Sequence, residues 1–166
     1  MHAVPLEDAD DWTRSPEPLR AIKTHLAWEF LPVSDRARYV TVIRDPQDVF
    51  VSSYPFFRDS VLGPAMPSVA SWLTMFLRGR TMGGSWAVHA NSYWVQRDRP
   101  NLRLLSFKSM KRDLPGTVRR MAGFLEVAAT QEVLDAVTER ASFAHMKSID
   151  HKFAVGRVIP WRKPGE

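Results

Sequence analysis

Residues 39–43, Tyr-Val-Thr-Val-Ile, form a short strand-like run that lacks the alternation of polar and apolar side chains typical of a half-buried strand. β-branched residues favour strands, and a strand that is apolar on both faces belongs to a sheet covered on both sides. The run ends at Arg44, and Asp45 and Pro46 follow it. Asp is a favoured N-cap and Pro suits the first helical position. We therefore predict a buried strand that passes directly into a helix.

The same alternation of strand-like and helical patterns continues along the chain. Further strands are predicted at 20–25 and 101–107, and helices at 46–54, about 68–80, about 85–98, 115–127, 130–141 and the start of 142–149. Pro55 should bend or end the first of these helices at Tyr54. Strands that alternate with helices indicate a parallel β-sheet flanked by helices, so the predicted fold class is α/β.

Size and composition set the broad class. The 166 residues suit a single domain, with irregular segments expected at 1–19 and 151–166. Without cysteine there are no disulfides and no thiolate metal sites, and we expect no metal cofactor. No apolar run approaches the roughly 20 residues of a membrane span, and the polar N-terminus is unlike a signal peptide. We expect a cytoplasmic protein with no membrane partner.

The charge balance points to an anionic small ligand. The net charge is +5, but the basic residues are scattered and form no dense stripe with interleaved aromatics. Nucleic-acid binding is therefore disfavoured.

Arg44 and Ser52 are the candidate anion-binding residues. Arg44 comes at the carboxyl end of a predicted parallel strand, beside a helix N-terminus, where open α/β sheets bind ligands. Ser52 lies seven residues after Asp45, nearly two turns on, and so projects from about the same face. A guanidinium and a hydroxyl directed at one volume suit a phosphate group. Alternatively, Arg44 pairs with Asp48 and Ser52 is a neutral helix residue, and the residues alone leave both interpretations open.

The block Y-V-x-V-x-R-D-P-x-D-V-x-V-S-x-Y-x-F-F at 39–57 resembles the 3′-phosphate-binding segment of the cytosolic sulfotransferases that use 3′-phosphoadenosine 5′-phosphosulfate (PAPS). The stretch at 20–32 is similar to that family's K-T-H-L-P, the stretch from 84 onward to its G-S-W-x-x-H-x-x-S-Y-W, and A-S-F-A-H-M-K at 141–147 to its T-S-F-x-x-M-K. The resemblance implies a P-loop-type sulfotransferase fold in which Arg44 and Ser52 hold the 3′-phosphate.

The resemblance also implies roles for other residues. Phe107 takes the place of a tyrosine near the adenine of the donor, and the remaining cofactor-binding candidates are Phe143, Arg162 and Lys163. Phe56 and His89 are candidates for the acceptor site. Trp72, Trp86 and Trp94 are further aromatic candidates for an apolar acceptor pocket, although tryptophans at helical spacing more often belong to the core.

Lys23 and His25 fall on the catalytic positions of the family. Sulfuryl transfer needs a base for the acceptor's proton and a cation for charge on the departing nucleotide, and histidine, with an unperturbed pKa near about 6.5, suits the first task. On an extended segment both side chains leave the same face, so one can address the acceptor and the other the donor. The implied acceptor is a small molecule with a hydroxyl or amine. Taken alone, His25 is more often a hydrogen-bonded histidine at a strand end, and the resemblance at 39–57 reverses that preference.

Several family elements are absent from these residues. The Lys-Ser-Gly-Thr-type loop that wraps the phosphosulfate, expected before 20–25, does not occur, and Pro164 interrupts the family's Arg-Lys-Gly segment. Ala141 replaces a usual hydroxyl residue. We therefore expect 1–166 to be a single partial sulfotransferase domain, without the first strand, loop and helix and without the family's C-terminal end, that is inactive or weakly active.

Other functional classes compete with an enzyme. A non-catalytic nucleotide-binding module, or pseudoenzyme, would keep only the 3′-phosphate site. A P-loop kinase relative is disfavoured because G-x-x-x-x-G-K-[ST] is absent. A plain interaction domain would leave the pattern of Lys23, His25, Arg44 and Ser52 as coincidence.

Overall fold

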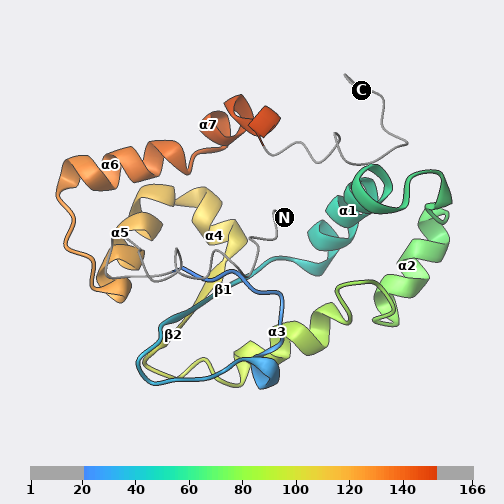
Figure 1. Cartoon of the computed structure of the whole chain (residues 1–166), viewed down its shortest axis with the longest axis horizontal. Helices are drawn as coiled ribbons and strands as arrows, with labels where there is room; N and C mark the ends of the chain where they lie inside the picture. The colour runs from blue at the N-terminus through green and yellow to red at the C-terminus, as the bar shows by residue number, and fades with distance from the viewer. Residues whose placement is uncertain (1–20, 153–166) are drawn as a thin grey trace, which may run out of the picture.

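The computed structural model describes residues 21–152. Its centre is a parallel pair of strands, β1 (Tyr39–Ile43) and β2 (Leu102–Ser106), in the register Tyr39↔Leu102 to Ile43↔Ser106. Helices α1, α2 and α3 lie to one side of these strands, and α4, α5 and α6 to the other (Figure 1). The prediction of an α/β fold with a parallel sheet flanked by helices is confirmed.

The first helix, α1 (Pro46–Phe57), begins as its sequence predicts. The Asp45 carboxylate accepts a hydrogen bond from the Gln47 N–H at 2.8 Å, and Pro46 occupies the first turn. The expected stop at Tyr54 is wrong, because the helix continues through Pro55 to Phe57. Pro55 cannot donate a backbone hydrogen bond, and the Tyr54 hydroxyl beside it donates to the carbonyl of Pro67 at 2.9 Å.

The remaining helices each begin at a side chain that accepts a hydrogen bond from the first turn, as helix N-caps do. They are α2 (Val69–Leu77), α3 (Trp86–Trp94), α4 (Phe107–Arg112), α5 (Leu114–Leu125), α6 (Gln131–Arg140) and α7 (Phe143–Ser148), capped by Ser68, Ser85, Ser106, Asp113, Thr130 and Ser142. Short helical turns lie at Trp28–Phe30, Arg58–Leu62, Gly63–Ala65 and Asp150–Lys152. Among the α-helices of residues 21–152, α4 is the one that was not predicted.

The strand predicted at 20–25 is wrong for the residues of it that the structure describes. Residues 21–27 have no regular secondary structure. A strand requires a neighbour that pairs with its backbone, and within 21–152 the sheet consists of β1 and β2.

The core lies on one face of the two strands. Trp28, Tyr93 and Leu102 are buried together, and the Trp28 ring meets Tyr39 edge-on at 5.2 Å. On the other face, Val40 and Val42 of β1 remain 44% and 47% exposed. The sheet is therefore sealed on the side of α3 and partly open on the opposite side.

Within 21–152, no single helix has the length and apolarity to cross a membrane. A bent pair, Pro46–Ala65 with Val69–Leu77 at 116°, meets that test by length and composition alone.

Candidate functional site

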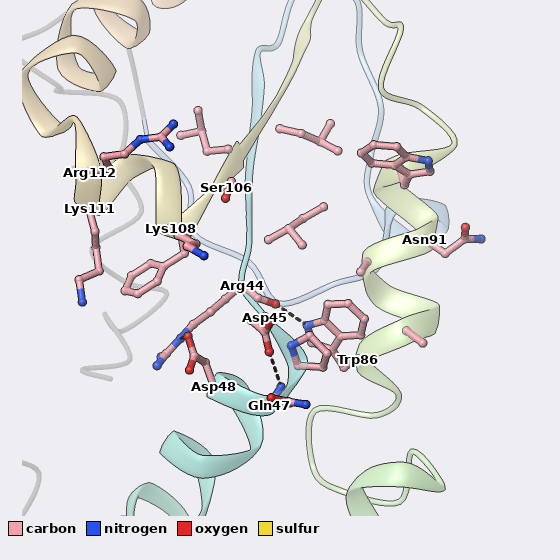
Figure 2. A pocket seen from close by; sticks show the side chains of 18 residues that line it. Arg44, Asp45, Gln47, Asp48, Trp86, Asn91, Ser106, Lys108, Lys111 and Arg112 are labelled. Atoms are coloured by element: carbon pink, nitrogen blue, oxygen red, sulfur yellow. Dashed lines mark hydrogen bonds and ion pairs between the residues drawn. The ribbon is translucent and has the colours of Figure 1, made fainter.

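The strand register brings Arg44 and Phe107 together. Ile43 pairs with Ser106, so the residues that follow, Arg44 and Phe107, emerge side by side at the carboxyl end of the sheet. The Arg44 guanidinium carbon lies 4.8 Å from the centre of the Phe107 ring, a cation–π contact. Figure 2 shows the Arg44 side chain beside Asp48 of α1.

Arg44 also reaches Ser52, as the helical phase of α1 predicts. Its Nη1 donates to Ser52 Oγ at 3.2 Å, while the same hydroxyl donates to the Val49 carbonyl at 3.2 Å. The alternative partner is present as well: Arg44 Nε lies 3.8 Å from Asp48 Oδ2, which is an ion pair but too long for a hydrogen bond. Arg44 Nε is buried and has no hydrogen-bond acceptor.

The neighbouring serine has a different task. Ser53 Oγ accepts a hydrogen bond from Trp72 Nε1 at 3.0 Å and donates to the Phe50 carbonyl at 2.8 Å. Trp72 is only 2% exposed, so it belongs to the core, as tryptophans at helical spacing more often do. Adjacent serines thus face different ways: Ser52 toward Arg44 and Ser53 toward the core.

An open cavity of about 1440 Å³ lies at this end of the sheet, between the start of α1, α3 and α4. Four cationic and two anionic side chains line it, together with three aromatic rings: Arg44, Lys108, Lys111 and Arg112; Asp45 and Asp48; Trp86, Trp94 and Phe107. Figure 2 shows the three cations of α4 on the wall opposite Asn91 of α3. The cavity therefore carries excess positive charge beside stacking surfaces, a combination that suits a phosphorylated ligand with a ring.

Helix α3 connects this cavity to the segment that follows His25. At its start, Trp86 Nε1 donates to the Arg44 carbonyl at 3.1 Å. Two turns later, the Tyr93 hydroxyl donates to the Leu26 carbonyl at 2.8 Å, and Ser92 Oγ accepts from the Trp28 N–H at 3.1 Å. Sequence reasoning missed these contacts, although the spacing of Trp86 and Tyr93 already placed them on one helix face.

Tyr93 is suited to act as a hydrogen-bond donor. Burial raises the pKa of its phenol, and the negative charge of Glu29 raises it further. The phenol therefore keeps its proton at neutral pH. The centres of the His89 and Tyr93 rings lie 5.2 Å apart, so His89 lies beside the tyrosine that binds the Leu26 carbonyl.

Lys23 and His25 stand apart from the cavity lining. Both side chains are exposed, on a segment without regular structure, so the expected strand does not hold them on one face. The segment is anchored just after them, where the Leu26 N–H donates to Thr24 Oγ1 at 3.1 Å and Tyr93 holds the Leu26 carbonyl.

The other predicted site residues that the structure describes do not line the cavity. Phe56 is 57% exposed and contacts Phe57, and Phe143 on α7 is 81% exposed. Arg162 and Lys163 lie outside the described residues. Across 21–152 there is no group of three or more His, Asp or Glu side chains placed to hold a metal ion.

Comparison with known proteins supports the relationship that the residues suggest. The family model described as "Sulfotransferase domain" matches residues 6–154. The chain belongs to the sulfotransferase family. Sulfotransferase 2A1 of Rattus norvegicus is 32% identical over 134 residues, covering 79% of this chain and 47% of the relative.

Solved structures agree with this assignment. A mouse sulfotransferase complexed with PAP superposes with a TM-score of 0.74 and 29% identity, over 84% of this chain and 51% of the other. Retinol dehydratase, in complex with androsterone and inactive cofactor PAP, gives a TM-score of 0.74 and 26% identity, over 95% and 49%. The chain spans about half the length of these relatives.

Proposed function

We propose that this chain provides the nucleotide 3′-phosphate site and the acceptor base of a PAPS-dependent sulfotransferase, which transfers a sulfuryl group to a hydroxyl or amine of a small acceptor. The observation that carries the proposal is the pairing of Arg44 with Ser52, beside Phe107, at the carboxyl end of the two parallel strands. Relatives crystallised with PAP, which we take as adenosine 3′,5′-bisphosphate, support the choice of nucleotide.

The residues present fit a phosphate group. The spare donor capacity lies on Arg44: its Nε has no acceptor, and its Nη1 contacts the Ser52 hydroxyl, whose own proton is donated to the Val49 carbonyl. Charge-assisted hydrogen bonds from a guanidinium to phosphate are short and strong. Phe107 offers a flat apolar surface at the same place for the base of the nucleotide.

The acceptor side of the proposal assigns His25 as the base and Lys23 as the stabilising cation. PAPS, when bound, supplies the sulfuryl group. His25 takes the proton from the acceptor, and Lys23 places positive charge where the nucleotide departs. Tyr93 and Ser92 position these residues indirectly, through the backbone of residues 26–28. Phe56 and His89 stay acceptor-site candidates, Phe143, Arg162 and Lys163 nucleotide-site candidates, and the cytoplasmic location stays a prediction.

Calorimetric titration with PAP tests the nucleotide site. At low salt the wild type should bind, and Arg44→Ala should weaken binding by about tenfold or more, since a charge-assisted hydrogen bond contributes roughly 1.5–3 kcal/mol. Added salt should weaken wild-type binding as well. Arg140→Ala, on the exposed surface of α6 and away from the cavity, is the control. Absence of wild-type binding, or equal affinities for the two variants, would overturn the proposal.

A second candidate function is nucleotide binding without catalysis. The exposure of Lys23 and His25, away from the cavity lining, favours it. The two candidates share the PAP site and differ only in whether His25 affects turnover, so a PAPS turnover assay of His25→Ala in a longer form that carries a phosphosulfate loop separates them.

A further inference from the structure

Helix α4 lines the cavity with positively charged side chains, and these have no role in the proposed 3′-phosphate site. Lys108, Lys111 and Arg112 all line the cavity together with Arg44. Within 21–152, none of these three α4 side chains forms an ion pair with an acidic residue. Unpaired cations on the wall of a cavity are available to an anionic ligand.

Of the three α4 cations, Lys111 is the one that contacts the same aromatic ring as Arg44. It follows Phe107 by four residues, which places both on one face of α4. Its Nζ lies 5.9 Å from the centre of the Phe107 ring, and the Arg44 guanidinium carbon lies 4.8 Å from the same centre. One aromatic ring therefore contacts two cations, one from the end of β1 and one from α4.

The two cations lack a shared neutralising carboxylate. Asp48 is 3.8 Å from Arg44 Nε, and no acidic side chain in the described part of the chain pairs with Lys111. Two like charges close to one ring repel each other, and an anion between them removes that repulsion while gaining attraction to both. Lys108 and Arg112, also four residues apart, continue the positive wall along α4.

We propose that Lys111 is a further ligand-binding residue of this site, which binds the same phosphate group as Arg44, and that Lys108 and Arg112 select ligands with a second anionic group. The inference rests on the proposed nucleotide function and extends it to α4. The chemical class of ligand is a small molecule with at least two phosphate groups, of which PAP is one example and inorganic pyrophosphate the simplest.

Calorimetry of the whole chain with PAP and with pyrophosphate tests the role of Lys111. Lys111→Gln should weaken both affinities by about three- to tenfold and make their salt dependence shallower, as expected when one partly exposed cation is lost. Lys111→Arg, which keeps the charge, should restore most of the affinity. Lys147→Gln on α7, an exposed lysine outside the cavity lining, should stay within about twofold of wild type.

A second comparison tests the selection for two anionic groups. The double variant Lys108→Gln/Arg112→Gln should weaken pyrophosphate binding and leave the affinity for inorganic phosphate nearly unchanged. Equal losses for both probes, or no loss for either, would overturn this selective role.

The outcomes separate this inference from the proposed function. If PAP binding depends on Arg44 while Lys111→Gln matches Lys147→Gln, the role of Lys111 is overturned and the nucleotide site stands. If pyrophosphate binds in a Lys111-dependent way but PAP does not bind, the anion site stands and the nucleotide assignment fails. If neither probe binds the wild type, both fail.

Discussion

Arg44 sits between a hydroxyl and a carboxylate, and this balance sets how readily it can take an anion. Ser52 leaves the guanidinium available because a hydroxyl carries no charge. Asp48, 63% exposed and 3.8 Å away, competes with an anionic ligand for the same cation. The competition is weak, because an exposed ion pair of this length contributes little.

Removing the competing charge should therefore strengthen anion binding. We expect Asp48→Asn to raise the affinity for PAP by about two- to fivefold, which is the size of a surface ion pair. Titration calorimetry at low salt measures it, with Asp98→Asn as a control on a carboxylate that pairs with Arg97 and does not line the cavity. A weaker affinity for Asp48→Asn would mean that Asp48 positions Arg44 rather than competing for it.

The two adjacent serines of α1 offer a matched pair of variants. Ser53→Ala leaves the buried Trp72 Nε1 without an acceptor and should lower the free energy of unfolding by about 1–3 kcal/mol. Ser52→Ala should leave stability nearly unchanged and weaken PAP binding. Denaturant unfolding and calorimetry on both variants measure the two effects, and the reverse assignment would contradict the orientations seen in α1.

Contacts in this site between residues close in sequence could be predicted, and contacts between residues far apart in sequence could not. Arg44 and Ser52 were expected to meet because Asp45 sets where α1 starts, and a helix start fixes the direction of every later side chain. The bond from Trp86 to the Arg44 carbonyl spans 42 residues and has no local signal. Lys111 was missed because Phe107 was assigned to the end of a strand, whereas Ser106 caps a six-residue helix that begins at Phe107.

At the scale of elements, Asp113 controls the junction between α4 and α5. It caps α5 by accepting from the Gly116 N–H at 2.9 Å, and Arg120 Nη1 donates to its other oxygen at 3.2 Å. The Gly116 hydrogen bond, followed by that from Arg120, lowers the pKa of Asp113 below its usual value of 3.8. The ionised form is therefore the one that stabilises the fold.

This lowered pKa gives a pH-dependent prediction. Stabilisation by Asp113 should be complete above pH 3.8 and should disappear as the pH falls through the lower pKa of the folded state. We expect Asp113→Ala to lower the melting temperature at neutral pH and the difference from wild type to shrink in acid. Thermal unfolding followed by circular dichroism at several pH values measures it. A difference that stays constant down to the most acidic pH would contradict the assignment.

The incorrect prediction of a strand at 20–25 shows that a local sequence pattern does not identify the pairing partner of a strand. The sequence of 20–25 does not indicate which other segment would pair with it, and a strand forms only where another strand lies alongside. Helices needed no such partner, which explains why α1, α2, α3, α5, α6 and α7 were all predicted close to their observed positions. The helix end expected at Tyr54 was also wrong: α1 continues through Pro55 to Phe57, where the Tyr54 hydroxyl contacts Pro67, 13 residues further along the chain.

At the scale of the whole molecule, α3 ties the anion site to the proposed base. Trp86 fixes the end of β1, while Ser92 and Tyr93 fix the residues just after His25. The chain spans about half the length of its relatives, and its 166 residues contain no Lys-Ser-Gly-Thr-type loop. If the proposed function holds, we expect binding of the nucleotide and transfer of its sulfuryl group to be separable in this chain.

This separation leads to the prediction for catalysis. The 166-residue chain should bind PAP but show little or no turnover of PAPS, whereas a longer form that carries a phosphosulfate loop before residue 20 should transfer sulfate to a hydroxyl or amine acceptor. In that longer form, His25→Ala should lower turnover by about two to four decades, the range for loss of a general base, with donor affinity nearly unchanged. Lys23→Ala should lower turnover and also weaken donor binding, because its charge acts on the donor before transfer.

A radiolabelled PAPS assay measures turnover, and calorimetry measures donor affinity. Unchanged turnover in His25→Ala would show that His25 is not the base, and it would favour the candidate function in which this chain binds the nucleotide without taking part in catalysis. Robust turnover by the 166-residue chain would show that the phosphosulfate can be held without the loop.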